Sequence, residues 1–321
     1  MRQGTIPSPA FALLLVLLSL WPRVAARGQE TFTVLTYNTE NTFDTIPSPQ
    51  GGDEEFLPEG SHHWTRRRYL HKLRNLAQVL LAADTLHPVD LVLLQEVESD
   101  TVMHDLLHRT PLASIPYEYI ITHAPDTRGI NVAIAYSPRT FQLLHTDTIG
   151  CGAPTRQVLH ACGRLNNGDT LLVYAVHLPS QLGGKRAQQL RDNLCDSVAA
   201  HILRHTQGMV SPRVLVAGDF NDQPAAACVR RLCHEAGLTN LMHGRRGGSY
   251  KWRGRWQWLD QVLLSPALCG PEPRLVNPSY LLEEDTAYRG EKPRRAFMGP
   301  VWHDGYSDHL PVVLTLTLTA Y

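Results

Sequence analysis

Apolar residues along this chain occur in two arrangements, short unbroken runs and longer stretches with helical spacing. The unbroken runs predict strands at 31–37, 90–97, 117–122, 130–136, 170–176, 213–217, 259–264 and 312–318. The spaced stretches have apolar residues at three- and four-residue steps and predict helices at 65–81, after Ser99, after Gly184 and at 225–236. Because helices separate many of the strands, the pattern predicts an α/β fold.

The same order of strand, helix and strand recurs in each half of the chain. Strands near 31 and 90 flank a helix in the first half, and Glu96 ends the second of them. Strands near 170 and 213 flank a helix in the second half, and Asp219 follows there. A carboxylate at the end of a buried strand lies at the rim of the sheet, where α/β proteins place their sites. We therefore expect two sheets packed face to face, with helices outside and one site where strand ends converge.

The first 26 residues have the three parts of a secretory signal peptide. Arg2 is the only charged residue before the apolar core at 12–20, and Val24-Ala25-Ala26 fits a cleavage site. The core is shorter than the roughly 20 residues of a membrane span. Cleavage after residue 26 predicts an exported protein, periplasmic or extracellular, without a stable membrane anchor; an uncleaved N-terminal anchor is the alternative. The remaining 321 − 26 = 295 residues show no obvious linker, so we expect one domain over 27–321.

Charge argues against a general binder of polyanions. Removing Arg2 and Arg23 leaves 28 basic against 30 acidic residues, so nucleic-acid contacts must come from local patches. The segment 248–258 interleaves basic and aromatic residues and is the best candidate for such contacts, with a hairpin partly in the core as the alternative. Arg66 to Arg68 could also meet phosphates, although a solvated basic helix face is the simpler interpretation. A long loop is expected between the strand at 259–264 and Asp308.

Six cysteines in an exported chain permit disulfides. Six cysteines allow 15 pairings, and we favour Cys151–Cys162, because this pair brackets a Gly/Pro-containing segment between two expected strands. Cys228 and Cys233 are five residues apart on a predicted helix, an awkward separation for a bridge. No cysteine spacing indicates zinc.

Polar side chains suited to hydrolytic chemistry stand at the strand ends: Asn38, Glu96, His177, Asp219 with Asn221, Asp260, and Asp308 with His309. Each one alone is more commonly a turn or rim residue. Together they predict one hydrolytic site that needs a divalent metal. Arg128, before Gly129, could present its guanidinium to a phosphate, and an ordinary turn arginine is the equal alternative.

Six short motifs carry a family resemblance. They are YNTEN at 37–41, LLQEVE at 93–98, AVHLPS at 175–180, AGDFND at 217–222, LDQVLLS at 259–265 and YSDHLPV at 306–312. In this order the set resembles the endonuclease/exonuclease/phosphatase family, which has the deoxyribonuclease I-like fold. The resemblance implies a four-layer α/β sandwich, with two packed mixed β-sheets flanked by helices, and metal-dependent cleavage of phosphoester bonds.

The resemblance also implies roles for the strand-end residues. Asn38, Glu96 and Asp308 would hold Mg²⁺, with Mn²⁺ or Ca²⁺ as alternatives. Asp219 would orient or deprotonate the attacking water, and Asn221 and His177 would donate hydrogen bonds to phosphoryl oxygens. His309 would pair with Asp260, and either Asp219 or His309 could be the general base. An acidic partner for His177 is expected, and Glu118 is the candidate.

The substrate class stays open among several phosphoesters. The basic and aromatic segment favours an endonuclease acting on nucleic acid, with Arg128 and Trp256 as substrate contacts. A phosphodiesterase or phosphatase for a lipid, as in sphingomyelinases, or for a small molecule is the alternative; no long apolar hairpin supports the lipid. A catalytically inactive binding module would lack a metal ligand or a phosphate contact, whereas each role here has a candidate. We expect a monomer.

Overall fold

The computed structural model describes residues 30–84, 87–268 and 272–318, which form two six-stranded sheets and several small hairpins. Strands of the first sheet lie in the order β13 (Arg274–Leu275), β18 (Val312–Leu318), β1 (Glu30–Thr42), β2 (Leu91–Val97), β4 (Asn131–Tyr136) and β3 (Glu118–Ile121). β1 and β2 run parallel and the other neighbours antiparallel. The first sheet is therefore mixed.

The second sheet repeats this plan. Its strands lie in the order β5 (Phe141–Ile149), β6 (Val158–Leu165), β7 (Thr170–His177), β8 (Arg213–Asp219), β12 (Asp260–Leu264) and β9 (Thr239–Asn240). Its parallel pair is β7 and β8, so each sheet contains one strand–helix–strand crossover, as expected from the sequence.

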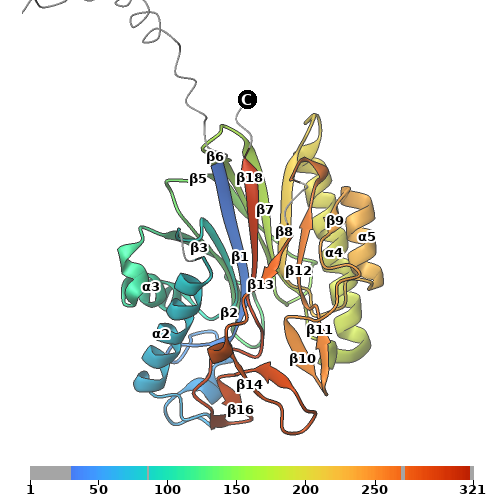
Figure 1. The fold of residues 1–321 in the computed structure, drawn as a ribbon. Coiled ribbons are helices and arrows are strands. Elements are labelled where there is room, and N and C mark those ends of the chain that lie inside the picture. Colours follow the sequence, from blue (N-terminus) through green and yellow to red (C-terminus); the bar gives the residue numbers. More distant parts are fainter. Residues whose placement is uncertain (1–29, 85–86, 269–271, 319–321) are drawn as a thin grey trace, which may run out of the picture.

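Helices cover the outer faces of both sheets (Figure 1). α2 (Arg66–Ala82) and α3 (Asp100–His108) flank the first sheet, and α4 (Gly184–Thr206) and α5 (Ala227–Ala236) flank the second. Short 3₁₀ helices occur at η1 (Glu54–Phe56), η2 (Pro111–Ser114), η3 (Gln181–Gly183), η4 (Pro266–Leu268) and η5 (Ser279–Leu281). The result is the four-layer α/β sandwich that the sequence predicts.

Three apolar cores hold the four layers together. One lies between the sheets, and one lies under each pair of helices. β2 shows how its unbroken apolar run is used: Leu91 and Leu93 face the core between the sheets, while Val92 and Leu94 face the core under α2 and α3. Because successive side chains of a strand point to opposite faces, a strand buried on both sides must be apolar throughout.

Local capping fixes the helix ends. The hydroxyl of Thr65 accepts from the Arg68 amide at the start of α2, and Ser99 does the same for Val102 at the start of α3. Gly237 closes α5 in the left-handed conformation, and its amide donates to the Cys233 carbonyl.

The expected long loop after β12 is wrong in part. This region folds back as two small hairpins, β14 (Leu282–Glu284) with β15 (Glu291–Pro293), and β16 (Phe297–Met298) with β17 (Val301–Trp302). Strands of two or three residues are too short to produce a detectable alternation. In the segment 248–258, the hairpin alternative is confirmed by β10 (Tyr250–Trp252) and β11 (Arg255–Gln257).

The expected Cys151–Cys162 disulfide is wrong, because both thiols are free. Cys151 lies in the β5–β6 loop, beyond the last paired residues Ile149 and Val158, whereas Cys162 is four residues further along β6. Four residues of strand span roughly 13 Å, which is too far for a bridge. Cys269 and the signal peptide at 1–26 lie outside the described residues. Within the described ranges, no helix has both the length and the apolar character needed to cross a membrane.

Candidate active site

The predicted strand-end residues converge on one cavity of about 610 Å³ at the end of the sandwich where β1 and β8 finish. Its lining includes Asn38, Glu96, Asp219, Asn221, Arg128, Asp308 and His309. Asp260 and His177 are buried directly behind this lining, where they contact His309 and Asp219. The structure thus brings together every predicted catalytic and metal-binding residue.

Two bulges aim the ends of β1 and β2 into the cavity. The register of β1 shifts between Asn38 and Thr42, and Glu40 and Asn41 adopt φ values of 52° and 49°. The register of β2 shifts at Glu96, which has φ of 63°. Non-glycine residues rarely adopt this left-handed conformation, and bulges re-aim side chains near functional sites. The Asn41 amide donates to Glu96 Oε2 at 2.9 Å, which fixes the two bulges to each other.

Gly218 allows β7 and β8 to approach closely enough to join their site residues. It has φ of 145°, and a Cβ there would lie 1.9 Å from the Val176 carbonyl oxygen. The parallel register places His177 beside Asp219. A side chain at position 218 would therefore prevent this close pairing.

Asp219 is the centre of the hydrogen-bond network. Its Oδ2 accepts from Asn38 Nδ2 at 2.9 Å and from Asn221 Nδ2 at 3.1 Å, and its Oδ1 accepts from the Asn221 amide at 2.8 Å. Burial raises the pKa of Asp219 to about 7, although the neighbouring His309 acts in the opposite direction. A carboxylate with this pKa can take up and release a proton near neutral pH.

His309 and Asp260 form a buried pair as predicted. Nδ1 of His309 lies 2.6 Å from Asp260 Oδ2, and the same oxygen accepts from the Ser249 hydroxyl at 2.6 Å. Burial alone would lower the pKa of His309, but the Asp260 carboxylate outweighs it and raises this pKa well above its usual value. The other ring nitrogen, Nε2, faces Asp219 Oδ2 at 3.9 Å. The Asp260 carboxylate therefore favours the protonated form of His309, which lines the cavity.

His177 has a different environment from the one expected. Its Nε2 lies 2.9 Å from an Arg156 guanidinium nitrogen, which also donates to the Leu178 carbonyl at 2.7 Å. Burial, followed by the Arg156 charge, lowers the pKa of His177 well below its usual value. The neutral Nε2 accepts from Arg156, so the predicted donation from His177 to a phosphoryl oxygen does not fit this arrangement of nitrogens.

Glu118 as a brace for His177 is wrong. It accepts a hydrogen bond from the Tyr136 hydroxyl at 2.8 Å and pairs across from Tyr136 in the register of β3 and β4. Tyr136 in turn lies opposite Leu91, at the start of β2, whereas the site is at the end of β2. Glu118 is thus at the opposite end of the sheet, which strand counting without a register could not reveal.

The amide of Asn221 is committed to protein partners. Its Nδ2 donates to the Leu178 carbonyl at 2.9 Å as well as to Asp219. A bond from Asn221 to a phosphoryl oxygen would therefore replace one of these two bonds.

The expected metal ligands offer hard oxygen atoms from two bulged strands and the loop before β18. Burial would raise the pKa of Glu96, but the positive charges of Arg128 and Arg156 outweigh it and hold this pKa below its usual range. Asp308 Oδ2 lies 3.2 Å from an Arg295 nitrogen, and Asn38 Oδ1 accepts from the Glu40 amide at 3.0 Å. Two carboxylates and an amide oxygen suit Mg²⁺ or Ca²⁺. Within the described ranges, no three His, Cys, Asp or Glu side chains form a metal-binding group by themselves, so the fit rests on Asn38 completing the set.

Arg128 reaches the site, whereas Trp256 does not. A guanidinium nitrogen of Arg128 donates to Asn41 Oδ1 and lies 3.4 Å from Glu96 Oε2. Trp256 packs against the core under α2 and α3 and is absent from the cavity lining. The alternation of β10 and β11 explains this: Lys251 and Trp256 pair on one face, and Trp252 is on the other face and lines the cavity.

Several cavity residues were missed by sequence reasoning. Arg156 and Arg295 line the cavity, and Glu40 is buried beside Arg295 with an Nε–Oε1 distance of 3.0 Å. Tyr250 and Trp252 also line the cavity; they belong to the segment 248–258 that was expected to contact nucleic acid, although only Trp256 was named there. Arg156 and Arg295 lie in irregular segments without periodicity, so no pattern marked them. The YNTEN motif did contain Glu40, but nothing in it distinguishes a residue that lines the cavity from a turn residue.

Comparison with known proteins agrees with this geometry. A model described as the Endonuclease/Exonuclease/phosphatase family matches residues 33–318. A search of curated protein sequences found no match.

Three solved structures illustrate the likeness in fold. An endonuclease/exonuclease/phosphatase family protein from Bacteroides thetaiotaomicron has 17% identity and a TM-score of 0.60, with 90% of this chain and 96% of that chain covered. A mannosyl-6-phosphatase from the same organism has 17% identity and a TM-score of 0.60, with 89% and 100% covered. Truncated TDP2 from Caenorhabditis elegans has 14% identity and a TM-score of 0.58, with 90% and 98% covered. At these identities the likeness concerns the fold alone.

The family match spans both sheets and all six motifs. This chain belongs to the endonuclease/exonuclease/phosphatase family, a family of phosphoric ester hydrolases that generally depend on a divalent metal.

Proposed function

We propose that this protein is an exported Mg²⁺-dependent endonuclease that hydrolyses phosphodiester bonds in nucleic acid. The observation that carries this choice is the pair Tyr250 and Trp252, two residues apart on β10, which both line the cavity that contains Asp219 and His309. Trp252 is 48% exposed, and the Arg253 guanidinium lies 5.6 Å from its ring centre. An exposed aromatic ring beside a cationic group is a suitable platform for a nucleic-acid base.

The chain's own residues supply the proton chemistry in this proposal. Asp219 accepts a proton from the attacking water, while its bonds from Asn38 and Asn221 hold the carboxylate in place. The new phosphorus–oxygen bond forms as the bond to the leaving oxygen breaks. His309 and Arg128 supply positive charge for the phosphoryl oxygens, and Asp260 keeps His309 protonated. With His309 already charged, Asp219 is the better general base.

Glu96, Asp308 and the side-chain oxygen of Asn38 would hold the metal. A bound Mg²⁺ would polarise the phosphate and neutralise charge on the leaving oxygen.

We also propose that the protein is exported and that it is a monomer in solution. The signal-peptide pattern at 1–26 supports export to the periplasm or the extracellular space, where no stable membrane anchor would remain after cleavage.

A small phosphoester is the second candidate, because the cavity volume of about 610 Å³ is in the range typical for small ligands. In that case Tyr250 and Trp252 would contact a sugar or another organic group rather than a base.

Nicking of supercoiled plasmid by the mature protein distinguishes the two candidates. We expect nicking with Mg²⁺, none with EDTA, and none by the Asp308→Ala variant. Bis-p-nitrophenyl phosphate and p-nitrophenyl phosphate are assayed in parallel. Hydrolysis of either small ester with an intact plasmid would reject the endonuclease in favour of the second candidate.

A further inference from the structure

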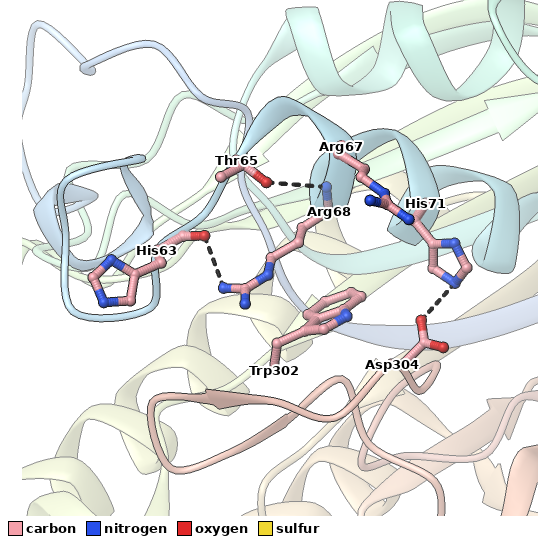
Figure 2. Close-up of a pocket in the computed structure, with 7 residues that line it drawn as sticks. All are labelled: His63, Thr65, Arg67, Arg68, His71, Trp302 and Asp304. Carbon is pink, nitrogen blue, oxygen red and sulfur yellow. Dashed lines mark hydrogen bonds and ion pairs between the residues drawn. The ribbon is translucent and has the colours of Figure 1, made fainter.

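A second cavity, of about 580 Å³, lies at the start of α2 and has no role in the chemistry described above (Figure 2). One side of the cavity is lined by three residues of α2: Arg67, Arg68 and His71. Another side is lined by Trp302 and Asp304, which precede the site residues Asp308 and His309 in the chain. The one carboxylate in the lining belongs to Asp304, and it already has a partner, since its Oδ1 lies 2.7 Å from Nε2 of His71. The two arginines give the cavity an excess of positive charge.

Arg68 is held in place before any ligand arrives. One of its terminal nitrogens donates to the carbonyls of His62 at 2.7 Å and His63 at 2.8 Å. Its guanidinium also lies over the Trp302 ring, 5.9 Å from the ring centre. Figure 2 shows Arg68 extended beside Trp302 toward His63. The remaining donors of a fixed guanidinium suit an anionic oxygen, since little side-chain freedom is lost on binding.

Arg67 supplies a second charge with no competing partner. It is exposed, and within the described parts of the chain no group forms a hydrogen bond or an ion pair with its guanidinium. In Figure 2 its guanidinium lies on the His71 side of the cavity, away from that of Arg68. Two guanidinium groups around one hollow are typical of phosphate recognition.

A third cavity, of about 400 Å³, adjoins the active-site cavity. It shares Asn41 and Arg128 with the active-site cavity. It also contains His62, whose neighbour His63 lines the cavity at α2. Glu54 and Glu55 line this third cavity, so a strand that passed it would place its phosphates away from these carboxylates.

Resting on the proposed endonuclease function, we propose that the cavity at the start of α2 is a remote phosphate-binding subsite for a polynucleotide. The strand would run from the active-site cavity past Arg128 and His62 and place a phosphate between Arg67 and Arg68. The subsite adds binding energy at a distance from the bond that is cleaved and leaves the chemical step unchanged.

The test compares substrates of different length. Steady-state kinetics with Mg²⁺ are measured for a dinucleotide and for a single-stranded oligonucleotide of about 12 nucleotides. The variants are Arg67→Gln, which breaks no bond with a described residue, and Arg67→Gln with Arg68→Lys. Arg74→Gln is the matched control, because Arg74 is exposed on the same helix and absent from the lining of all three cavities.

We expect Arg67→Gln to raise KM for the long substrate about tenfold, with kcat unchanged and with no effect on the dinucleotide. The dependence of log KM on log salt should become shallower by about 0.7 unit in Arg67→Gln, and Arg68→Lys should add little to this change because lysine keeps the positive charge. Equal KM values for the wild type, the variants and the control on the long substrate would overturn the subsite.

Failure of the proposed function gives a different result. If the wild type cleaves neither oligonucleotide, the endonuclease assignment falls, and the subsite is judged by binding alone. A fluorescently labelled single strand of about 12 nucleotides is then titrated into the Asp219→Asn protein, with and without the additional Arg67→Gln substitution. Weaker binding caused by Arg67→Gln supports the subsite, whereas equal binding or no binding by either protein rejects it.

Discussion

Oδ2 of Asp260 lies 2.6 Å from Nδ1 of His309, and Asp260 is buried behind His309, which lines the cavity. Asp260 begins β12 of the second sheet, and His309 lies just before β18 of the first. This pair therefore sets the charge of the imidazole and also joins the two sheets at the site.

Asp260→Asn should lower the pKa of His309, because the attraction that outweighs burial is lost. His309 would then lose its proton at a lower pH, and the high-pH limb of the pH–rate profile should move to lower pH. We expect the rate at neutral pH to fall by about 10²- to 10⁴-fold. Ser249→Ala is the control, since it removes a hydrogen bond from the same carboxylate but leaves its charge. An unmoved high-pH limb in Asp260→Asn would contradict the role of the pair.

Asp308→Ala should abolish hydrolysis and weaken the binding of Mg²⁺ while the fold stays intact. Asp308 is partly exposed in the cavity lining, so its removal leaves no large void in a core. Metal affinity is measured by calorimetry, and the fold by circular dichroism. Asp196→Ala, on the exposed side of α4, is the control. Turnover by Asp308→Ala at the wild-type rate would mean that the site is wrongly assigned.

Lys72→Met should lower both stability and activity. Lys72 is fully buried at 0% exposure, its Nζ donates to the Tyr306 carbonyl, and burial lowers its pKa to about 8. The substitution removes one of the two cations that favour the ionised form of buried Glu40, Arg295 being the other. It also removes the bond to the segment that carries Asp308, so we expect a loss of about 3 kcal/mol in the free energy of unfolding. Urea denaturation measures this loss, with the exposed Arg74→Met as control. A variant as stable as the wild type would show that the charge on Lys72 is not needed.

Stability should fall in mild acid because of a buried histidine far from the site. His160 is at 0% exposure among Tyr174, His201 and His205, and burial lowers its pKa to about 4. The unfolded chain binds a proton near pH 6.5, so between these values it binds more protons than the folded protein. The stability that comes from keeping His160 neutral is therefore fully present above about pH 6.5. As the pH falls toward 4, the free energy of unfolding should decrease by up to about 3 kcal/mol.

His160→Phe should flatten this pH dependence, while His108→Gln, exposed on α3, should not. Urea denaturation at several pH values gives the slopes. If His160→Phe retained the wild-type slope between pH 6.5 and 4, another group would be responsible.

The sequence was sufficient for the layers of the fold because they depend on periodicity. The unbroken apolar run of β2 and the regular leucines of α2 each have one plausible structure. The small hairpins β14 to β17 depend instead on contacts with the rest of the chain, such as the bond from the Arg294 amide to the Leu281 carbonyl. Contacts of this kind leave no local pattern.

The same division applies to the site. Residues at strand ends, such as Asp219 and His309, were predictable because strand direction carries them to one edge. Arg156 and Arg295 were not, because irregular segments bring them in. Trp256 rather than Trp252 was predicted as a contact because the composition of the segment does not show which face of the hairpin meets the cavity.

The hydrogen bond from Asn38 to Asp219 crosses from the first sheet to the second, as the Asp260–His309 contact does. The catalytic groups therefore belong to two halves that are held in alignment mainly by the core between the sheets. A small slip of one half against the other would separate these groups before any helix or strand melted. On heating, the catalytic rate should therefore fall at a lower temperature than the secondary-structure content. A ligand that contacts both halves in the cavity would stabilise their alignment.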